Sequence, residues 1–214
     1  MENSSKLRTL YILRVLEEYT DENHHLTTAE IVNILEEKYN LTTHRTTIPT
    51  DIKILCDYGI DIITVKSSQN KYYIGSRSLE VPEIKLLIDA IQSSKFITAK
   101  KSKALVQKLT AMTSKYQSKN LNRNIVVDKR IKPNNEKIYY IVDALNDAIN
   151  NKTKVSFYYF DFLPNKKKHM KNNGKPYVIS PYSLAWTGDY YYLIGYSDER
   201  EKTLVFRVDR IDKE

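Results

Sequence analysis

The sequence predicts an α+β protein, with a helical N-terminal part and a β-rich C-terminal end. The first 75 residues contain the signals of three short helices and a hairpin. Helical spacing of apolar residues returns from Leu79 to about Lys119. From residue 155 onward, runs of β-branched and aromatic residues alternate with turn-forming residues. A block of helices followed by a block of strands is typical of the α+β class.

Local signals place the N-terminal helices and the hairpin. We expect the first helix to bury one apolar stripe, formed by Leu7, Leu10, Tyr11, Leu13 and Leu16. Thr27 and Glu30 form a capping-box pattern, which predicts the start of a second helix. A third helix is expected to end at Gly59, after an apolar face of Ile48, Ile52 and Leu55. Residues 60–65 and 71–74 predict two strands joined by a turn.

The rest of the chain divides into a helical middle and a β-rich end. Residues 115–137 are polar and rich in lysine, so we predict a linker there, followed by a helix over 138–149. Two hairpin turns are expected, at Gly188 and at 198–200. The predicted domains are residues 1–76, a helical connector over 77–137, and a β domain over 138–214.

Composition argues against several classes of protein. No apolar run approaches the roughly 18 residues that a membrane-spanning helix needs. The N-terminal residues form an amphipathic helix rather than a signal peptide. The single cysteine, Cys56, suits a reducing cytoplasm, and we expect it to be a small core residue. Because no metal-ligand spacing or catalytic motif appears, we expect a cytoplasmic protein that is not an enzyme and has no metal or cofactor.

The net charge of +8 is unevenly distributed along the chain. Residues 1–75 carry a net charge of −3, residues 76–137 of +9, and residues 138–214 of +2. Positive charge attracts nucleic acid, so the N-terminal segment is not a DNA-binding candidate on bulk charge. Any DNA contact made by this segment must depend on a local cluster of residues.

Residues 41–62 contain such a cluster. A helix that enters the major groove needs short polar or basic side chains on one face and apolar side chains on the other. The polar face consists of Thr43, His44, Arg45, Thr46, Thr47, Thr50 and Lys53, and the hairpin adds Lys66 and Lys71. These residues are the predicted contacts with double-stranded DNA. A protein-interaction module with the same composition is the alternative.

Residues 6–75 resemble the winged helix-turn-helix of DeoR-like and WYL-domain regulators, which implies DNA binding. The resemblance rests on Arg45, Thr47, Ile48, Asp51, Ile52, Leu55, Gly59, Ile60, Tyr72 and Tyr73. The sequence departs from the family at Thr46 and Thr50, where arginine is frequent, and at Pro49, where an aromatic residue is frequent. Because proline lacks an N–H and clashes inside a helix, the helix here must begin a turn later than in the family.

Residues 181–211 resemble the WYL domain, a small Sm-like β barrel named after a Trp-Tyr-Leu tripeptide. The tripeptide here is Tyr-Tyr-Leu at 191–193, and a Phe-Arg-x-Asp-Arg-Ile pattern follows at 206–211. In that family, arginines and tyrosines of this region line a pocket implicated in sensing nucleic acids or nucleotide-like molecules. The resemblance implies five ligand-binding residues: Tyr182, Tyr190, Tyr192, Arg207 and Arg210.

Arg207 and Arg210 are three positions apart in the sequence. Residues at odd and even positions face opposite sides of an uninterrupted strand, so these two arginines would face opposite sides. We therefore expect the strand to bend or end near Val208 and Asp209, or Arg207 and Arg210 to have different roles. A structural ion pair between Asp209 and Arg210 is the alternative to a ligand-binding role. The lysines at 166–168, with Lys171 and Lys175, are expected to form a solvated hairpin loop, and a contribution to binding an anionic ligand is the alternative.

The predicted function is a DNA-binding transcription regulator whose WYL-type domain senses a nucleotide or a nucleic-acid ligand. A homodimer is expected, because one small DNA reader rarely supplies enough affinity for a palindromic site. The alternative is an RNA- or single-strand-binding protein whose winged helix is a protein-interaction module, and the acidic balance of residues 1–75 favours it. A dimerisation module without a small ligand is a third possibility. WYL regulators usually continue beyond the Asp-Arg-Ile motif, so we also expect the chain to be a fragment whose barrel lacks a last strand.

Overall fold

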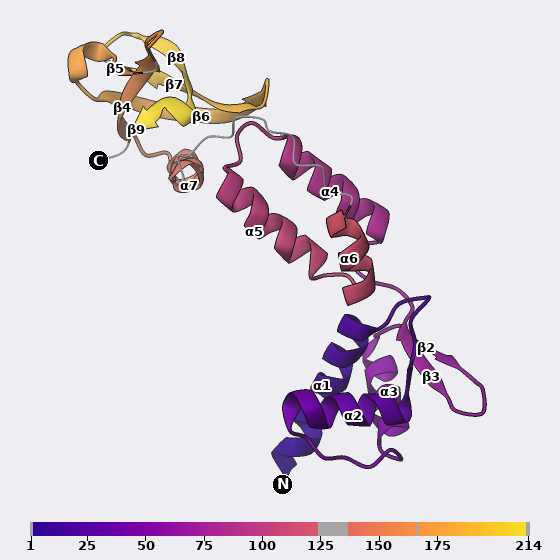
Figure 1. Cartoon of the computed structure of the whole chain (residues 1–214). Helices are drawn as coiled ribbons and strands as arrows, with labels where there is room; N and C mark the ends of the chain where they lie inside the picture. Colours follow the sequence, from indigo (N-terminus) through magenta and orange to yellow (C-terminus); the bar gives the residue numbers. More distant parts are fainter. Residues whose placement is uncertain (1, 124–136, 166, 213–214) are drawn as a thin grey trace. The chain divides into compact units, whose positions relative to one another are not determined.

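The computed structural model describes residues 2–123, 137–165 and 167–212, and it divides into two compact units (Figure 1). Of the described residues, the first unit contains 2–92 and 103–123, and the second contains 93–102 and 137–212. Helices and antiparallel sheets are both present, so the predicted α+β class is confirmed. The three-domain division stays a prediction. Within the described ranges, no helix is long and apolar enough to cross a membrane.

The first unit begins with three helices and a small antiparallel sheet. The helices are α1 (Glu2–Tyr19), α2 (Thr28–Tyr39) and α3 (Ile48–Tyr58). The strands are β1 (Leu26–Thr27), β2 (Ile62–Val65) and β3 (Lys71–Ile74), in the order β1-β3-β2. These helices and the β2–β3 hairpin follow the predicted order, whereas the two-residue strand β1 was not predicted.

Local signals set the ends of these helices. The Thr27 side chain accepts a hydrogen bond from the backbone N–H of Glu30, and the Glu30 carboxylate accepts one from the N–H of Thr27, which completes the capping box. α3 has Pro49 in its first turn, where an N–H would lack an intrahelical partner anyway. Gly59 ends α3 with a φ of +105°, a conformation that glycine adopts without a steric cost.

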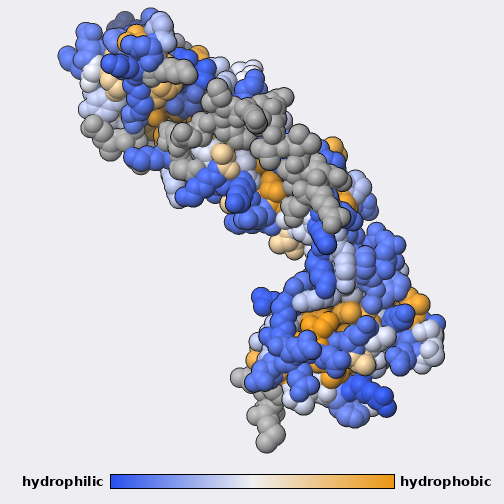
Figure 2. All heavy atoms as spheres, in the orientation of Figure 1, coloured by the Kyte–Doolittle hydropathy of each residue, from blue (hydrophilic) through white to orange (hydrophobic). Residues whose placement is uncertain are grey.

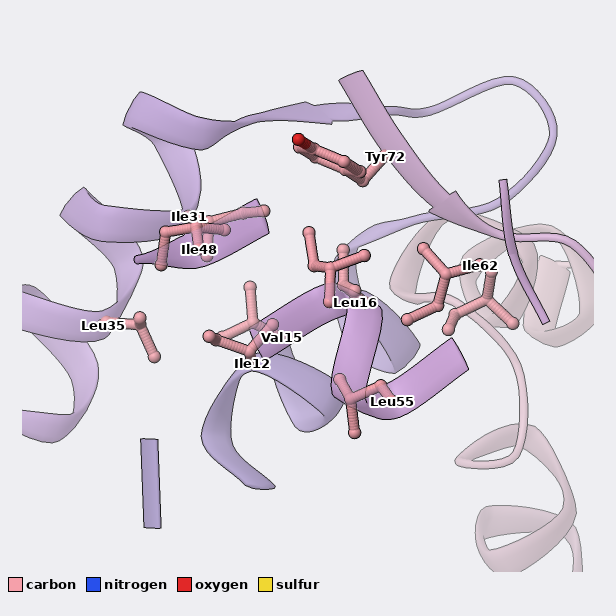
Figure 3. Packing of buried hydrophobic residues seen from close by; sticks show 11 residues of the cluster. Ile12, Val15, Leu16, Ile31, Leu35, Ile48, Leu55, Ile62 and Tyr72 are labelled. Carbon is pink, nitrogen blue, oxygen red and sulfur yellow. The ribbon is translucent and has the colours of Figure 1, made fainter. Parts of the chain in front are cut away.

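The core of the first unit lies between α1, α2, α3 and the small sheet (Figure 3). It includes Ile12, Val15, Leu16, Ile31, Leu35, Ile48, Leu55, Ile62 and Tyr72. The predicted stripe of α1 is wrong in part, because Leu7 and Leu10 are exposed while Ile12 and Val15 are fully buried. α1 has apolar residues on two neighbouring faces, and packing against α2 and α3 selects between them.

Cys56 is exposed and is not the core residue that the sequence predicts. The buried residues of α3 are Ile48, Asp51, Ile52 and Leu55. One step along a helix rotates a side chain by about 100°, so Cys56 lies beside this face rather than on it. The correction follows from the position of the buried stripe, which the type of residue does not determine.

Three further helices follow: α4 (Val81–Ser93), α5 (Ala99–Thr110) and α6 (Lys115–Arg123). Ile84, Ile88, Val106 and Leu121 form a small core of their own. The predicted linker is therefore wrong over 115–123, which is α6, and its residues 124–136 lie outside the described residues. The helix contributes one buried leucine, and so short a polar helix depends on tertiary packing rather than on a periodic pattern.

The second unit contains α7 (Ile138–Asn150) and a curled antiparallel sheet. Its strands are β4 (Val155–Phe162), β5 (Lys168–Met170), β6 (Tyr177–Thr187), β7 (Tyr190–Ser197), β8 (Lys202–Arg207) and β9 (Ile211–Asp212). The short 3₁₀ helices are η1 (Asn172–Gly174) and η2 (Val208–Arg210). The strand order is β5-β4-β6-β7-β8, and β9 returns to pair with β4. The two predicted hairpin turns are present between β6 and β7 and between β7 and β8.

α7 covers the core of this sheet. Ile138, Ile141 and Leu145 pack with buried residues of the strands: Phe157, Ile179, Leu193 and Phe206. β6 and β7 approach closely at Gly195, where a Cβ atom would lie 2.4 Å from Ile179 Cγ2 and 2.7 Å from the Ser180 carbonyl oxygen. Only glycine fits this crossing without a shift of the neighbouring strand.

Candidate nucleic-acid interface

α3 is fixed to α1 by a buried carboxylate. Asp51 is 3% exposed and accepts hydrogen bonds from Arg8 Nε at 2.6 Å, Arg8 Nη2 at 3.2 Å and Thr9 Oγ1 at 2.9 Å. The hydrogen bond with Asp51 is the main reason that the pKa of Arg8 is raised. A bidentate pair fixes direction as well as distance, so Asp51 holds the angle at which α3 presents its outer face. The sequence pattern includes Asp51 but gives no sign of its partners.

The predicted DNA-contact residues lie on the turn before α3, on its outer face and on the β2–β3 hairpin. His44, Arg45, Thr46, Thr50, Lys53, Lys66 and Lys71 are exposed, whereas Thr43 and Thr47 are half-buried. Among the residues that the structure describes, Arg45, Lys53 and Lys66 have no hydrogen-bond or ion-pair partner. These three cations are therefore available to an anionic ligand without breaking an existing contact.

Four of the predicted residues shape the turn itself. The hydroxyl oxygens of Thr43 and Thr47 lie 2.9 Å apart, and Thr47 Oγ1 also donates to the His44 carbonyl at 2.7 Å. His44 Nδ1 and Thr46 Oγ1 lie 2.8 Å apart. Since these side chains hydrogen-bond one another, their first role is structural. They hold a turn that exposes Arg45.

The positive charges of this region are local, which explains how a segment of net negative charge can present a basic face. Residues 41–75 carry four cations, Arg45, Lys53, Lys66 and Lys71, and three carboxylates, Asp51, Asp57 and Asp61. Asp51 is neutralised by Arg8. The other acidic residues of 1–75 precede residue 41 and belong to α1, α2 and their connection.

The chain that leaves β3 is held to α1 and to the end of α5 by Arg77. Its Nη2 donates to the carbonyl oxygens of Glu17 at 2.7 Å and Thr20 at 2.9 Å, and its Nη1 donates to that of Met112 at 3.3 Å. Burial of the guanidinium lowers the pKa of Arg77. One side chain thereby ties the helices after the hairpin to the first helix.

A second set of contacts between α6 and the segment after α1 is centred on Asp21, which is 2% exposed. Its carboxylate accepts hydrogen bonds from Ser114 Oγ at 2.5 Å, His24 Nδ1 at 2.7 Å and the backbone N–H of Asn23 at 3.0 Å. The His24 ring stacks on Tyr116 of α6 at 3.6 Å. Burial opposes the charge of Asp21, but these hydrogen bonds outweigh it, so the pKa of Asp21 is lowered.

The free energy of unfolding of the first unit should therefore fall as the pH is lowered through the depressed pKa of Asp21. A carboxylate with a lower pKa in the folded state stabilises the fold above its unfolded pKa, and this contribution is lost as the pH falls through the folded-state pKa. Urea unfolding at a series of acidic pH values measures the effect, and Asp21→Asn should flatten the profile. Identical profiles for the two proteins would contradict the assignment.

In the second unit, Arg207 is the last residue of β8, and its guanidinium is bound on two sides. Nε donates to Asp209 Oδ1 at 3.0 Å and Nη2 to Asp209 Oδ2 at 2.7 Å. The guanidinium carbon lies 3.7 Å from the centroid of the Tyr190 ring. The hydrogen bonds from Arg207 to Asp209 are the main cause of the raised pKa of Arg207. Two of its five N–H donors are used by Asp209.

Arg210 lies in η2 and pairs with β4 rather than with Asp209. Its Nη1 donates to Asp161, whose other carboxylate oxygen lies 3.0 Å from Lys171 Nζ. The hydrogen bond from Lys171 is the largest influence that lowers the pKa of Asp161. The predicted alternative of an Asp209–Arg210 pair is therefore wrong. The expectation that the strand ends near Val208 is confirmed, because β8 stops at Arg207.

Residues 140–213 match the family model of the WYL domain. This part of the chain is a WYL domain. No curated protein matches the chain. Among solved structures, Proteasome accessory factor B/C (PafBC) of Arthrobacter aurescens is 13% identical with a TM-score of 0.30, over 96% of this chain and 32% of that chain. The chain thus spans about a third of that protein's length. The WYL resemblance found in the sequence is confirmed, and the DeoR-like resemblance of residues 6–75 stays a prediction.

The strand register of the WYL domain brings three of its five predicted ligand residues together. Tyr192 of β7 pairs directly with Arg207 of β8, and Tyr190 lies two residues away on the same face. Tyr182 is 57% exposed at a bulge in β6, and no ring contact or hydrogen bond joins it to either arginine in the described part of the chain. The WYL domain therefore presents a cluster of Tyr190, Tyr192 and Arg207, with Arg210 in the 3₁₀ helix that follows.

Two further residues of the WYL domain contact this cluster and were missed in the sequence. Tyr159 of β4 accepts a hydrogen bond from the backbone N–H of Arg207 at 3.2 Å, and burial raises the pKa of Tyr159. Asp161 holds both Arg210 and Lys171. Neither has a sequence signal, because β4 lies about 50 residues before the Phe-Arg-x-Asp-Arg-Ile pattern and meets it only through the pairing of β4 with β9.

The described lysines of the predicted loop are exposed, but Lys168 begins β5 rather than lying in a loop, and two of the lysines are paired. Lys168 Nζ lies 2.8 Å from Asp212, and Lys171 pairs with Asp161. Lys166 lies outside the described residues. Within the described ranges, no group of three or more histidine, cysteine or acidic side chains is placed to hold a metal ion.

Proposed function

We propose that the protein is a DNA-binding transcription regulator whose WYL domain binds a nucleotide or a single-stranded nucleic acid. The observation that carries the proposal is the exposed face of α3 and the hairpin in a chain that also has a WYL domain. Arg45, Lys53 and Lys66 on this face have no hydrogen-bond or ion-pair partner among the described residues. A DNA reader and a ligand domain in one chain are the two parts that a ligand-controlled regulator needs.

The arrangement of the first unit supports interpreting residues 6–75 as a winged helix-turn-helix. Three helices precede a hairpin, and a short strand between α1 and α2 pairs with β3. In that interpretation α3 is the recognition helix, whose N-terminal residues contact base edges in the major groove. Arg45 and Lys53 then lie toward the groove, and Lys66 lies on the wing toward the phosphates.

The arginines of the WYL domain support a phosphate-binding role. A guanidinium binds phosphate through paired hydrogen bonds, and tyrosine rings such as Tyr190 and Tyr192 offer stacking surfaces for bases. Arg210 Nε is a buried donor without a hydrogen-bond partner among the described residues. Such a donor costs about 1–3 kcal/mol, and an acceptor that rearranges the Arg210–Asp161 pair would relieve this cost. The return of β9 to β4 supports the predicted Sm-like barrel as the scaffold.

Selection from a pool of random-sequence DNA duplexes with the full chain tests the DNA-reading part. We expect specific sequences to be enriched, and Arg45→Ala to bind the selected duplex at least tenfold more weakly, because a charge-assisted contact is lost. Arg14→Ala is the matched control, since it removes the same charge from the exposed side of α1. A palindromic site would agree with the proposed homodimer. No enrichment, or equal losses in both variants, would contradict the proposal.

The proposed wing, which is the β2–β3 hairpin, leads to a separate prediction about how duplex binding depends on salt concentration. Lys66→Ala should weaken binding to all duplexes by a similar factor and reduce the slope of log K against log salt by about 1, because one phosphate contact is lost. Titrations at several salt concentrations, on the selected duplex and on a scrambled one, measure both effects. An unchanged slope would remove Lys66 from the phosphate contacts.

One observation favours the alternative, in which the first unit binds a protein and the WYL domain binds RNA or single-stranded DNA. Hydrophobic side chains reach the surface of the first unit (Figure 2). The exposed large hydrophobic residues of the described part of this unit include Ile54 and Tyr58 of α3 and Ile63 and Val65 of β2. Binding of single strands but of no duplex by the full chain would support this alternative.

A further inference from the structure

The outer face of α3 has an unusual composition for a helix that contacts bases. Its exposed residues near the middle are Thr50, Lys53, Ile54 and Asp57, opposite the buried face of Ile48, Asp51, Ile52 and Leu55. Ile54 is 52% exposed and belongs to no buried cluster of the described chain. Because burial of apolar surface is favourable in free energy, the exposed surface of Ile54 would stabilise contact with a partner.

The outer face of α3 combines polar and apolar candidates for base contacts. Arginine or lysine reads guanine, asparagine or glutamine reads adenine, and aspartate accepts a hydrogen bond from cytosine. α3 has Lys53 and Asp57 on this face but no arginine, asparagine or glutamine. An apolar side chain reads thymine, because the thymine C5-methyl group projects into the major groove. Thr50 lies one helical turn before Ile54 and adds a second methyl group to the same face.

We propose that Ile54 reads a thymine methyl group, so that the DNA site has a T·A pair opposite the middle of α3. This inference rests on the proposed function and adds a base preference to it. The charges of the same unit favour DNA as the occupant, because Arg45, Lys53 and Lys66 are exposed and have no hydrogen-bond or ion-pair partner among the described residues, and Lys53 is the neighbour of Ile54 in α3. An apolar protein partner would not need them.

Replacement of thymine by deoxyuridine is the test, since it removes the C5-methyl group and leaves base pairing unchanged. Each thymine of the selected duplex is replaced in turn, and binding is measured for the full chain and for Ile54→Ala. We expect one replacement to weaken binding of the unsubstituted protein roughly fourfold, the effect of one buried methyl group. Ile54→Ala should bind the thymine duplex more weakly and should not distinguish thymine from deoxyuridine at that position.

Val65→Ala is the control, because it shortens an exposed apolar side chain of the wing and should retain the discrimination. Ile54→Val, which keeps a branched apolar side chain, should retain most of it. The inference is overturned if no deoxyuridine replacement weakens binding, or if Ile54→Ala still prefers thymine. Failure to select any duplex would overturn the proposed function itself. The two failures can be distinguished, because the selection is carried out before any thymine is replaced.

Discussion

Asp51→Ala is expected to lower the free energy of unfolding of the first unit by about 2 kcal/mol, because a buried acceptor of three hydrogen bonds is lost and the partly buried Arg8 is left without its partner. Asp51 is 3% exposed, and its loss removes the acceptor of Arg8 Nε, Arg8 Nη2 and Thr9 Oγ1 together. A helix that has lost this link also loses its fixed angle to α1. Duplex binding by α3 should weaken as a second consequence.

Two spectroscopic signals separate this effect from general destabilisation. Trp186, the only tryptophan, lies in β6 and reports on the second unit, whereas most helices lie in the first unit and dominate the far-ultraviolet circular dichroism. Asp51→Ala should shift the urea midpoint of the dichroism and leave that of Trp186 fluorescence unchanged. Asp57→Ala, an exposed change in the same helix, should change the free energy of unfolding obtained from either signal by no more than about 0.5 kcal/mol. Equal behaviour of the two variants would exclude the structural role given to Asp51.

The second large effect is expected in the WYL domain. An Arg207→Ala/Arg210→Ala variant should bind short single-stranded DNA or RNA at least a hundredfold more weakly, because two charge-assisted contacts of about 1.5–3 kcal/mol each are lost. The ion pairs with Asp209 and Asp161 hold both guanidiniums in place before a ligand arrives. Fluorescence anisotropy of labelled 12-nucleotide strands, at two salt concentrations, measures the loss.

Arg200→Ala provides a control for the effect of charge, although it removes one positive charge where the double variant removes two. Arg200 lies in the turn between β7 and β8 and donates to Asn172 Oδ1 at 2.6 Å, so its removal takes one positive charge from the same domain outside the cluster. It should weaken binding slightly, and added salt should reduce the difference. Binding that is equal in the double variant and the unsubstituted protein would exclude Arg207 and Arg210 as ligand contacts and leave duplex reading by α3 as the nucleic-acid function.

Much of the local structure was predictable, because the signals are local. Thr27 and Glu30 cap α2 within four residues, Gly59 ends α3, and turn residues place both hairpins of the WYL domain. The WYL domain itself was recognised from a long sequence pattern and confirmed. Each of these features depends on residues that are close in the chain, where covalent geometry limits the choices.

The sequence predicted which residues belong to the candidate sites, but it did not predict which residues they contact. The parity of Arg207 and Arg210 left two alternatives, an interrupted strand or different roles for the two residues, and β8 does end at Arg207. The partner of each arginine did not follow, because Asp161 reaches Arg210 only when β9 pairs with β4. Strand register over some 50 residues decides that contact, and no local pattern encodes it.

The sequence by itself determined the first three helices and the hairpins, the α+β class and the identity of the WYL domain. Only the tertiary structure decided which face of α1 is buried, that Cys56 is exposed, and that residues 115–123 form a helix. The tertiary structure also decided two pairs of partners. Asp51 binds Arg8, 43 residues away in the chain, and Asp21 binds Ser114, 93 residues away. Burial and pairing depend on which surfaces exclude water together, and that is a property of the packed fold rather than of any one segment.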